Sequence, residues 1–185
     1  AGFLEDQLNL SAAVYKIRQD NFGVAIADVL APDGSQAYES KSGTSTKGFE
    51  IEATGRLSKQ WDLSAAFTRN LVADADGARL NTDVPQNSFK FYSSYRLPQV
   101  GHGLVLGGGL RWQSGVYAEN AGPNKVRTSN PSYAVVDVMA RLWLNDRVTL
   151  NLNVANLFDK HYRQSVFNGY WGAPRSVTLA MEARF

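Results

Sequence analysis

The stretch RSVTLAMEARF, residues 175–185, alternates between apolar and polar side chains and ends on an aromatic residue. From Ser176 onward the odd-numbered positions are apolar, and the even-numbered positions are polar except for Ala180. Successive side chains of a β-strand point to opposite faces. The pattern therefore predicts a strand with one apolar face and one polar face.

Seven further segments repeat this alternation: LNLSAAV (8–14), GFEIEATGRL (48–57), WDLSAAFTRN (61–70), SFKFYSSYRL (88–97), GLVLGGGLRWQSG (103–115), YAVVDVMARLWL (133–144) and VTLNLNVAN (148–156). A period of two residues in segments of about ten residues is typical of antiparallel strands and not of helices. The sequence thus predicts an all-β protein with about eight strands.

The connections between these segments alternate in length. RLSKQ, LPQVG and the ND at 145–146 are short, whereas the polar stretches at about 19–45, 72–85, 118–131 and 158–173 are long. Short turns on one side and long loops on the other are typical of outer-membrane β-barrels, and the segment length suits a tilted transmembrane strand. Aromatic residues near strand ends suit the two membrane interfaces: Trp61, Tyr95, Trp112 and Phe185.

A soluble β-sandwich or a lipocalin-like barrel also has alternating strands. Two features argue against both. The polar faces carry many charged residues, which need a wet or ion-paired environment: Glu50, Glu52, Arg56, Lys90, Arg96, Arg111, Asp137 and Arg141. The apolar faces are also broad and continuous enough to contact lipid. The pattern favours an antiparallel transmembrane β-barrel.

Composition excludes several classes of function. A net charge of +2 and the absence of any Lys/Arg run argue against nucleic acid as a partner. The chain has no cysteine, which excludes a disulfide framework and thiolate chemistry. The opening AGFLEDQLNLS lacks the regions of a signal peptide and resembles a hairpin turn entered midway, so we expect this chain to be a piece of a longer protein.

The segment NLNVANLFDKHYR, residues 151–163, resembles the penultimate strand and following loop of TonB-dependent outer-membrane receptors. Seven residues match that family's pattern: Asn153, Asn156, Leu157, Phe158, Asp159, Lys160 and Tyr162. STKGFEIEATGRLSKQWDLSAAFT and GYWGAPRSVTLAMEARF resemble other parts of the same barrel, and SSYRLP and GGGLRWQSGVY resemble its siderophore-receptor branch. Five motifs in the correct order identify the chain as similar to this family along nearly its whole length.

The resemblance implies a 22-stranded barrel, filled by an N-terminal plug, in the outer membrane of a Gram-negative bacterium. Residues 1–185 have room for about the last eight strands, so we expect the plug domain and the N-terminal barrel strands to lie outside this C-terminal segment. The implied activity is import of a ferric siderophore, hydroxamate-type favoured, with energy from the TonB-ExbB-ExbD complex acting through the plug. Outer-membrane lipid and the barrel-assembly machinery are the other implied partners, and no intrinsic cofactor or catalysis is implied.

Two other functions stay open at this stage. Eight is the strand number of the smallest complete barrels, so the alternative is a self-contained barrel with a structural, adhesive or porin role. An outer-membrane enzyme is a third class, disfavoured because no convincing catalytic set is present. His161 near Asp159 and Ser165 would have to form a triad within one loop, which rarely provides the geometry.

Candidate ligand-binding residues are the aromatic residues of the long loops and the outer strand ends. By resemblance to hydroxamate-siderophore receptors, Phe167 matches a position that lines the ligand pocket. Tyr170 and Trp171 follow it in the same loop, and Tyr117 and Tyr133 lie on the lumen parity at outer strand ends. The competing interpretation is that these rings belong to the interfacial girdle or pack the loops.

Two polar clusters have other interpretations. DADGARLNTD, residues 74–83, resembles a calcium loop, but its glycine is displaced and the Glu of an EF-hand is missing, so a polar turn is expected and no metal site is predicted. Arg111, Asp137 and Arg141 point inward, where they could pair with one another or with a plug.

Overall fold

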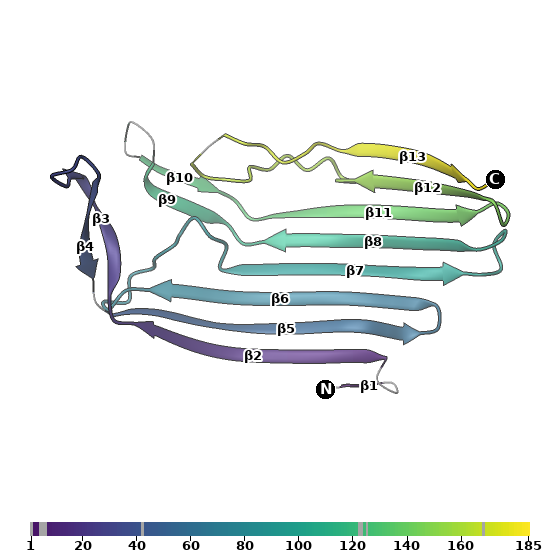
Figure 1. Ribbon diagram of the computed structural model, residues 1–185, viewed down its shortest axis with the longest axis horizontal. Coiled ribbons are helices and arrows are strands. Elements are labelled where there is room, and N and C mark those ends of the chain that lie inside the picture. Colours follow the sequence, from purple (N-terminus) through teal and green to yellow (C-terminus); the bar gives the residue numbers. More distant parts are fainter. Residues whose placement is uncertain (1, 4–6, 42, 122–123, 125, 168) are drawn as a thin grey trace.

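The computed structural model describes residues 2–3, 7–41, 43–121, 124, 126–167 and 169–185, which form thirteen strands and no helix (Figure 1). Among these residues, no helix is long and apolar enough to cross a membrane. Nine strands form the main sheet: β1 (Gly2–Phe3), β2 (Leu8–Gln19), β5 (Thr44–Ser58), β6 (Trp61–Ala73), β7 (Asn87–Leu97), β8 (Leu104–Gln113), β11 (Tyr133–Trp143), β12 (Val148–Ala155) and β13 (Ser176–Ala183).

The main sheet is an antiparallel meander in the order β1-β2-β5-β6-β7-β8-β11-β12-β13. The connections β5–β6, β7–β8 and β11–β12 are short and lie together at one end of the sheet, and all the long connections lie at the other end (Figure 1). This arrangement confirms the eight predicted strands and the predicted alternation of connection lengths. We call the two ends the short-turn end and the long-loop end.

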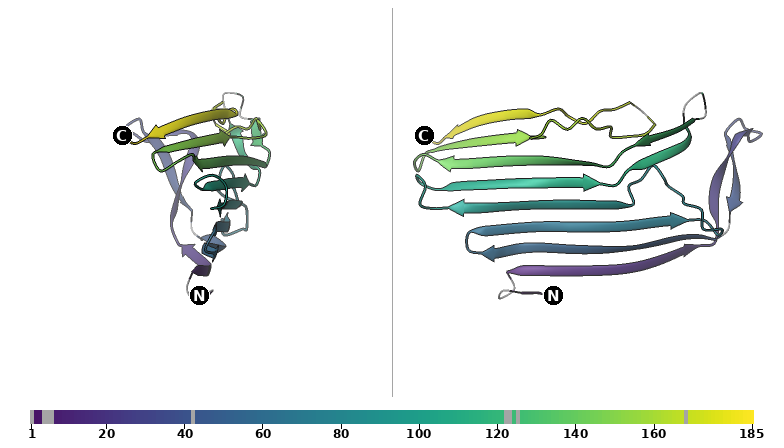
Figure 2. Two further views of the ribbon diagram at one scale, coloured as in Figure 1. Left: turned by 90° about the vertical axis from the view of Figure 1, so that its right-hand side faces the viewer. Right: turned by 180° about the vertical axis from the view of Figure 1, so that it is seen from behind.

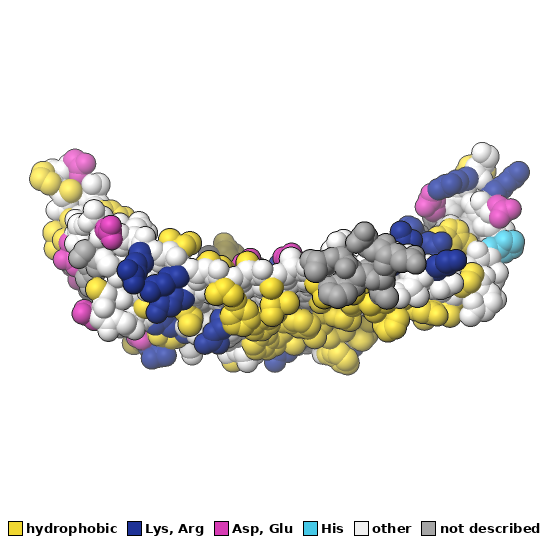
Figure 3. All heavy atoms as spheres, turned by 90° about the horizontal axis from the view of Figure 1, so that it is seen from below, with side chains coloured by type: hydrophobic (Ala, Val, Ile, Leu, Met, Phe, Trp, Pro, Cys, Tyr) yellow, Lys and Arg dark blue, Asp and Glu magenta, His cyan; other side chains and the backbone are white. Residues whose placement is uncertain are grey.

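The pairing of the strands places the apolar side chains of all eight predicted segments on the same face of the sheet. Val154 lies opposite Val138 on one side and Val177 on the other, and Ile51 lies opposite Ala12 and Phe67. Seen nearly end-on, the sheet is an arc (Figure 2, left), and hydrophobic side chains gather along its convex side between charged ends (Figure 3). The polar parities line the concave side. These are the lipid-facing and lumen-facing surfaces of a barrel wall.

The sheet has very little interior of its own. The accessible surface of the whole chain is 12,688 Å², whereas a compact protein of 20.3 kDa would expose roughly 8,800 Å². Among the described residues only four hydrophobic side chains are buried, namely Val116, Ala118, Val135 and Val166. Both faces of the sheet therefore depend on something outside this chain, as expected for a wall between lipid and a filled lumen.

Aromatic residues mark the short-turn end of the convex face. Trp61 lies directly opposite Tyr95, with ring centroids 6.3 Å apart in an edge-on arrangement. The indole N–H of Trp61 donates a 2.7 Å hydrogen bond to the hydroxyl of Ser93. Trp112, on the same face at the long-loop end of β8, lies opposite Phe89. Amphipathic rings at both ends of the apolar belt suit the two membrane interfaces.

Two of the predicted long loops contain strands that the sequence analysis missed. Residues 19–45 include the hairpin β3 (Phe22–Leu30) and β4 (Gln36–Lys41), and residues 118–131 include most of the hairpin β9 (Val116–Ala121) and β10 (Val126–Asn130). A register shift interrupts the pairing of each hairpin. Such an irregularity breaks the side-chain alternation by which a strand is recognised. The prediction of irregular loops there was incomplete.

The described strands do not close into a barrel. β1 pairs with β2 and β13 pairs with β12, and these two strands are the opposite edges of the sheet. Unpaired edges are unfavourable in lipid, because their N–H and C=O groups would lack partners. The nine-stranded sheet is therefore a segment of a larger barrel, and not the self-contained eight-stranded barrel considered above.

Candidate ligand-binding site

A pocket of about 520 Å³ opens among the loops at the long-loop end of the sheet. Three separate segments line it: the β6–β7 connection, β9, and the connection between β12 and β13. The lining residues are Ala78, Arg79, Leu80, Asn81, Thr82, Asp83, Tyr117, Ala118, Glu119 and Phe167. Two of the predicted ligand-binding residues, Tyr117 and Phe167, thus share one pocket.

Two guanidinium groups hold the Tyr117 ring. The guanidinium carbon of Arg127 lies 3.9 Å from the ring centroid and that of Arg79 lies 5.3 Å from it. Arg127 also pairs with Glu119 at 3.3 Å, and the backbone N–H of Tyr117 donates to the carbonyl of Thr82 at 2.9 Å. Cation–π contacts of this kind orient a ring. The pocket therefore presents an oriented aromatic side chain beside the guanidinium of Arg79 and the carboxylates of Asp83 and Glu119, which also line it.

Phe167 is held at this pocket by its neighbour in sequence. Val166 is buried against Val116 and Ala118 of β9, in the hydrophobic cluster found among the described residues. The backbone N–H of Phe167 donates to the Ser165 hydroxyl at 3.1 Å, and the side chain remains 66% exposed. The buried Val166 therefore holds the exposed Phe167 ring at the pocket, although the ring itself does not pack into the protein.

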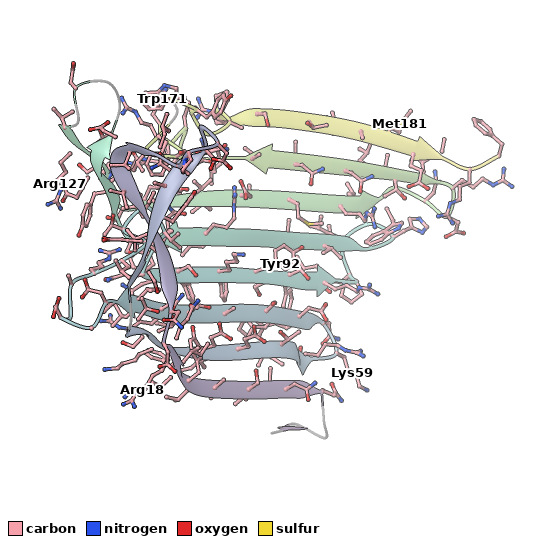
Figure 4. All side chains as sticks on the ribbon, turned by 60° about the vertical axis from the view of Figure 1, so that its left-hand side comes forward. Arg18, Lys59, Tyr92, Arg127, Trp171 and Met181 are labelled. Carbon is pink, nitrogen blue, oxygen red and sulfur yellow. The ribbon has the colours of Figure 1, made fainter. Side chains whose placement is uncertain are left out.

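Tyr170 and Trp171 are exposed but are not among the residues that line this pocket. The guanidinium of Arg163 lies 5.3 Å from the Trp171 ring centroid, and these two residues form a β-bridge. The backbone N–H of Gln164 donates to the carbonyl of Tyr170 at 2.9 Å. Figure 4 shows Trp171 at the long-loop end, in the connection that leads to β13. The predicted ligand contacts of Tyr170 and Trp171 remain predictions.

Tyr133 contacts another aromatic residue of the protein. Its ring stacks on Tyr162 with centroids 4.3 Å apart and planes at 27°. Gly172 packs against the Tyr162 ring so closely that a Cβ atom would overlap it. Tyr133, Tyr162 and Gly172 thus join the start of β11 to the loop before β13, and the predicted ligand contact of Tyr133 remains a prediction.

Asn156 holds this last loop together, a role that the sequence motif did not reveal. The side chain is buried, with 3% exposure, and the backbone has a positive φ of 50°. Its amide nitrogen donates to the carbonyls of Lys160 and Ala173, both at 3.0 Å, and its amide oxygen accepts from the Lys160 N–H at 2.8 Å. Asn tolerates the left-handed conformation better than most residues. One side chain therefore connects the two ends of the loop.

Two neighbours of Asn156 extend this anchor. The backbone N–H of Asn156 donates to Asp137 Oδ1 at 2.8 Å, which ties the loop to β11. Asp159, also at positive φ, accepts the N–H of Arg175 at 2.9 Å just before β13 begins. Two of the matched residues of the motif, Asn156 and Asp159, thus position the loop that carries Phe167.

The concave face carries a hollow of about 650 Å³ across β6, β7, β8, β11 and β12. Lys90, Arg111, Asp137, Tyr92 and Met139 are among its lining residues. Arg111 pairs with Asp137 at 3.3 Å, which is one of the two arrangements predicted for these inward charges. Figure 4 labels Tyr92 in the middle of this face.

Arg141, the third of those inward charges, pairs elsewhere. Its Nε donates to Asn151 Oδ1 at 2.6 Å, and its guanidinium lies 5.9 Å from the Trp143 ring centroid. The hollow is therefore lined by a neutralised pair and by Lys90, for which no ion pair with a described residue is present.

The calcium-like stretch forms a turn. Asp74 Oδ1 accepts the backbone N–H groups of Asp76 at 3.1 Å and Ala78 at 2.8 Å, and Gly77 has a φ of 84°. In the part of the chain that the structure describes, no three His, Cys, Asp or Glu residues are grouped so as to hold a metal ion. His102 lies at the short-turn end, 3.8 Å from Asp146, far along the strands from the loop that carries His161.

A curved antiparallel sheet with an apolar convex face, a polar concave face and a pocket at its long-loop end defines part of a transmembrane β-barrel with a pocket among its outer loops. Residues 2–157 match the family described as "TonB dependent receptor-like, beta-barrel". The chain belongs to the TonB-dependent receptor family, as its motifs predict, and is part of an outer-membrane protein of a Gram-negative bacterium.

Similar proteins include several siderophore receptors. The chain is 37% identical over 183 residues to the ferric-pyoverdine BN7/BN8 receptor of Pseudomonas putida, covering 98% of this chain and 21% of that protein. It is 30% identical over 190 residues to the ferripyoverdine receptor of Pseudomonas aeruginosa, covering 96% of this chain and 23% of that protein. The chain thus spans about a quarter of the length of these relatives.

Solved structures agree with this assignment. The fold matches the FpvAI–pyocin S2 complex with a TM-score of 0.86 at 29% identity, covering 98% of this chain and 26% of that one. It matches the ferripyoverdine receptor of Pseudomonas aeruginosa bound to ferripyoverdine with a TM-score of 0.84 at 28% identity, covering 98% and 25%. The predicted fold class, part of a larger TonB-dependent receptor barrel, is confirmed.

Proposed function

We propose that the full-length protein is an outer-membrane receptor that binds a ferric siderophore at the long-loop end of its barrel and imports it into the periplasm. The observation that carries this proposal is the similarity, over 96% or more of the chain, to proteins named as receptors for ferric pyoverdines. The pocket among the outer loops supports it, because it lies where a ligand arriving from outside would first meet the barrel.

Within this proposal, Phe167 and Tyr117 contact the chelate and Arg79 favours its negatively charged groups. Aromatic faces bury the apolar parts of a ligand, and a guanidinium near the pocket attracts carboxylate or hydroxamate oxygens. Tyr170, Trp171 and Tyr133 are proposed as outer contacts for the periphery of a bulky ligand. Iron is the cargo, and the siderophore supplies its ligand atoms, so the barrel needs no metal site of its own.

The proposed transport has three steps and no covalent chemistry. The ferric siderophore binds beneath the outer loops. A plug domain, which we place against the concave face and its 650 Å³ hollow, senses the bound ligand. The TonB-ExbB-ExbD complex then acts on the plug and opens a path to the periplasm. We assign no enzymatic activity and no intrinsic cofactor to the protein.

A hydroxamate-type chelate remains the proposed ligand class, and ferric pyoverdine is the first siderophore to test because two relatives are named for it. The test is growth under iron limitation on a panel of single ferric siderophores, with and without the full-length gene, together with uptake of radioactive iron. We expect gene-dependent uptake of at least one siderophore that stops when the proton-motive force is collapsed. Equal uptake with and without the gene on every siderophore would overturn the proposal.

A further inference from the structure

Three charged side chains line the pocket among the outer loops, namely Arg79, Asp83 and Glu119. Two of them have partners inside the protein. The Glu119 carboxylate pairs with the Arg127 guanidinium at 3.3 Å. The Arg79 guanidinium donates to the Val84 carbonyl at 3.4 Å and lies 5.3 Å from the Tyr117 ring centroid. The third charge is the carboxylate of Asp83.

The Asp83 carboxylate has no hydrogen bond and no ion pair with any residue that the structure describes. The side chain is exposed, and it lines the pocket together with the Phe167 ring. Two acidic side chains thus line one pocket, and a neighbouring cation neutralises only Glu119. A negatively charged group at a binding surface is complementary to a positively charged part of the ligand.

Backbone hydrogen bonds on both sides hold Asp83 in place. The Val84 N–H donates to the Asn81 carbonyl at 3.1 Å, which closes a turn with Asp83 inside it, and Asn81 has a φ of 49°. The Tyr117 N–H donates to the Thr82 carbonyl at 2.9 Å, which ties the turn to β9. Because this backbone is ordered before a ligand arrives, Asp83 loses less conformational freedom on binding.

Arg127 shows how a cation is held at this end of the barrel. Its guanidinium carbon lies 3.9 Å from the Tyr117 ring centroid, and one of its nitrogens lies 3.3 Å from the Glu119 carboxylate. Figure 4 places Arg127 at the long-loop end. An aromatic face and a carboxylate together stabilise one cation, because both present negative charge to it.

Asp83 and Phe167 offer the same two kinds of group to the pocket. The Phe167 ring is 66% exposed, and no ring or guanidinium of the described residues contacts it. No described side chain supplies a cation to this pair. A ligand with an ammonium or guanidinium group supplies one, with its charge at the Asp83 carboxylate and its CH₂ groups on the Phe167 ring.

We propose that Asp83 is a ligand-binding residue that selects ferric chelates with a free cationic group. The inference rests on the proposed function and narrows its ligand class to chelates whose periphery carries an ammonium or a guanidinium. In this arrangement Arg79 binds the negatively charged oxygen atoms of the chelate and Asp83 binds its positively charged arm. One pocket then recognises both kinds of charge.

The test measures the affinity of the purified full-length receptor for two ferric chelates, each with and without its positive charge. The chelates are a linear trihydroxamate with one terminal amine and a pyoverdine chosen for a free amine on its peptide, and acetylation removes the charge of each. We expect the wild type to bind the amine form of at least one chelate about tenfold more tightly than the acetylated form. Asp83→Asn is expected to bind both forms as weakly as the wild type binds the acetylated form.

Asp76→Asn is the matched control. Asp76 lies on the same β6–β7 connection and is exposed, but it is not among the residues that line the pocket. This variant removes the same charge outside the pocket, so it is expected to keep the preference of the wild type for the amine form. Heat-modifiable mobility on a gel checks the folding of both variants.

A charge swap provides a second test. Succinylation of the amine turns the positive arm of the chelate into a negative one. Asp83→Lys is expected to bind the succinylated chelate about tenfold more tightly than the wild type does, and to bind the amine form more weakly than the wild type. Misfolding would weaken the binding of every form, so it cannot produce this reversal.

The possible failures can be told apart. Equal affinities of the wild type for the amine and acetylated forms of both chelates would overturn the inference and leave the proposed function in place. A preference for the amine form that persists in Asp83→Asn would also overturn it, because another residue would then bind the cation. If the wild type binds no form of either chelate, the proposed function fails and the inference fails with it.

Discussion

The strands of the sheet and the loops at its outer end are stabilised in different ways. Along the strands, most side chains of both faces are half-buried or exposed and very few are buried, and the strands are held to one another by backbone pairing. At the long-loop end, Val116, Ala118 and Val166 form a buried cluster and Asn156 makes several internal hydrogen bonds. The wall thus relies on lipid and on the contents of the lumen. The long-loop end, which carries the proposed binding site and is called the binding end below, is held together by contacts within the chain.

This difference suits a receptor. The wall needs only apolar side chains on the face toward lipid and polar side chains on the face toward the lumen. A site that recognises a ligand needs side chains held in place before the ligand arrives, because ordering them at binding costs affinity.

Placing a charge on the convex face should disrupt the wall. Leu152 lies between Ala140 and Leu179 in the middle of the apolar belt, so Leu152→Arg should cost about 2–4 kcal/mol in free energy of unfolding. Asn153→Arg, one residue away on the concave face, should change it by less than about 0.5 kcal/mol. Urea unfolding in lipid vesicles measures both. Similar losses from the two variants would contradict the assignment of faces.

Removing the loop anchor should damage the binding end more than the wall. Asn156→Ala leaves the carbonyls of Lys160 and Ala173 without their donor and places Ala at positive φ, so we expect a loss of about 2–3 kcal/mol. Asn156→Gly keeps the backbone conformation and should lose less. Local hydrogen exchange in residues 157–175 is the measurement, with the concave-face variant Asn153→Ala as control. Unchanged exchange rates in Asn156→Ala would show that the loop is held by other contacts.

Truncating the pocket aromatics should weaken ligand binding without unfolding the barrel. Phe167→Ala and Tyr117→Ala should each weaken siderophore binding about tenfold, and Phe158→Ala, an exposed residue outside the pocket lining, should have no effect. Titration of the purified receptor with ferric siderophore provides the affinities. A wild-type affinity in both pocket variants would remove the pocket from the binding site.

The ion pair between the two regions should contribute least. Asp137 accepts the N–H of Asn156 with one oxygen and pairs with Arg111 through the other. Asp137→Asn keeps an acceptor for the first contact and removes the charge, so we expect a loss of about 0.5–1 kcal/mol that disappears at high salt. Unfolding at low and high ionic strength is compared with Arg111→Gln. A salt-independent loss would mean that the charge of Asp137 is unimportant.

The sequence predicted the wall better than the binding end. All eight main strands and both faces follow from parity, and the family motif was recognised in residues 151–163. The hairpins β3–β4 and β9–β10 were missed because irregular pairing, with Asp28 at positive φ in β3, interrupts the alternation. The motif also did not reveal that Asn156 is a buried anchor, since its partners Ala173 and Asp137 are distant in sequence.

The eight main strands, their apolar and polar faces and the family could be predicted from the sequence, because side-chain alternation and local motifs are properties of short segments. By contrast, the shared pocket of Tyr117, Phe167 and Arg79 and the loop anchor at Asn156 became visible only in the folded chain. Pairing register and loop packing bring together residues that are far apart along the chain, and neither can be read from any one segment.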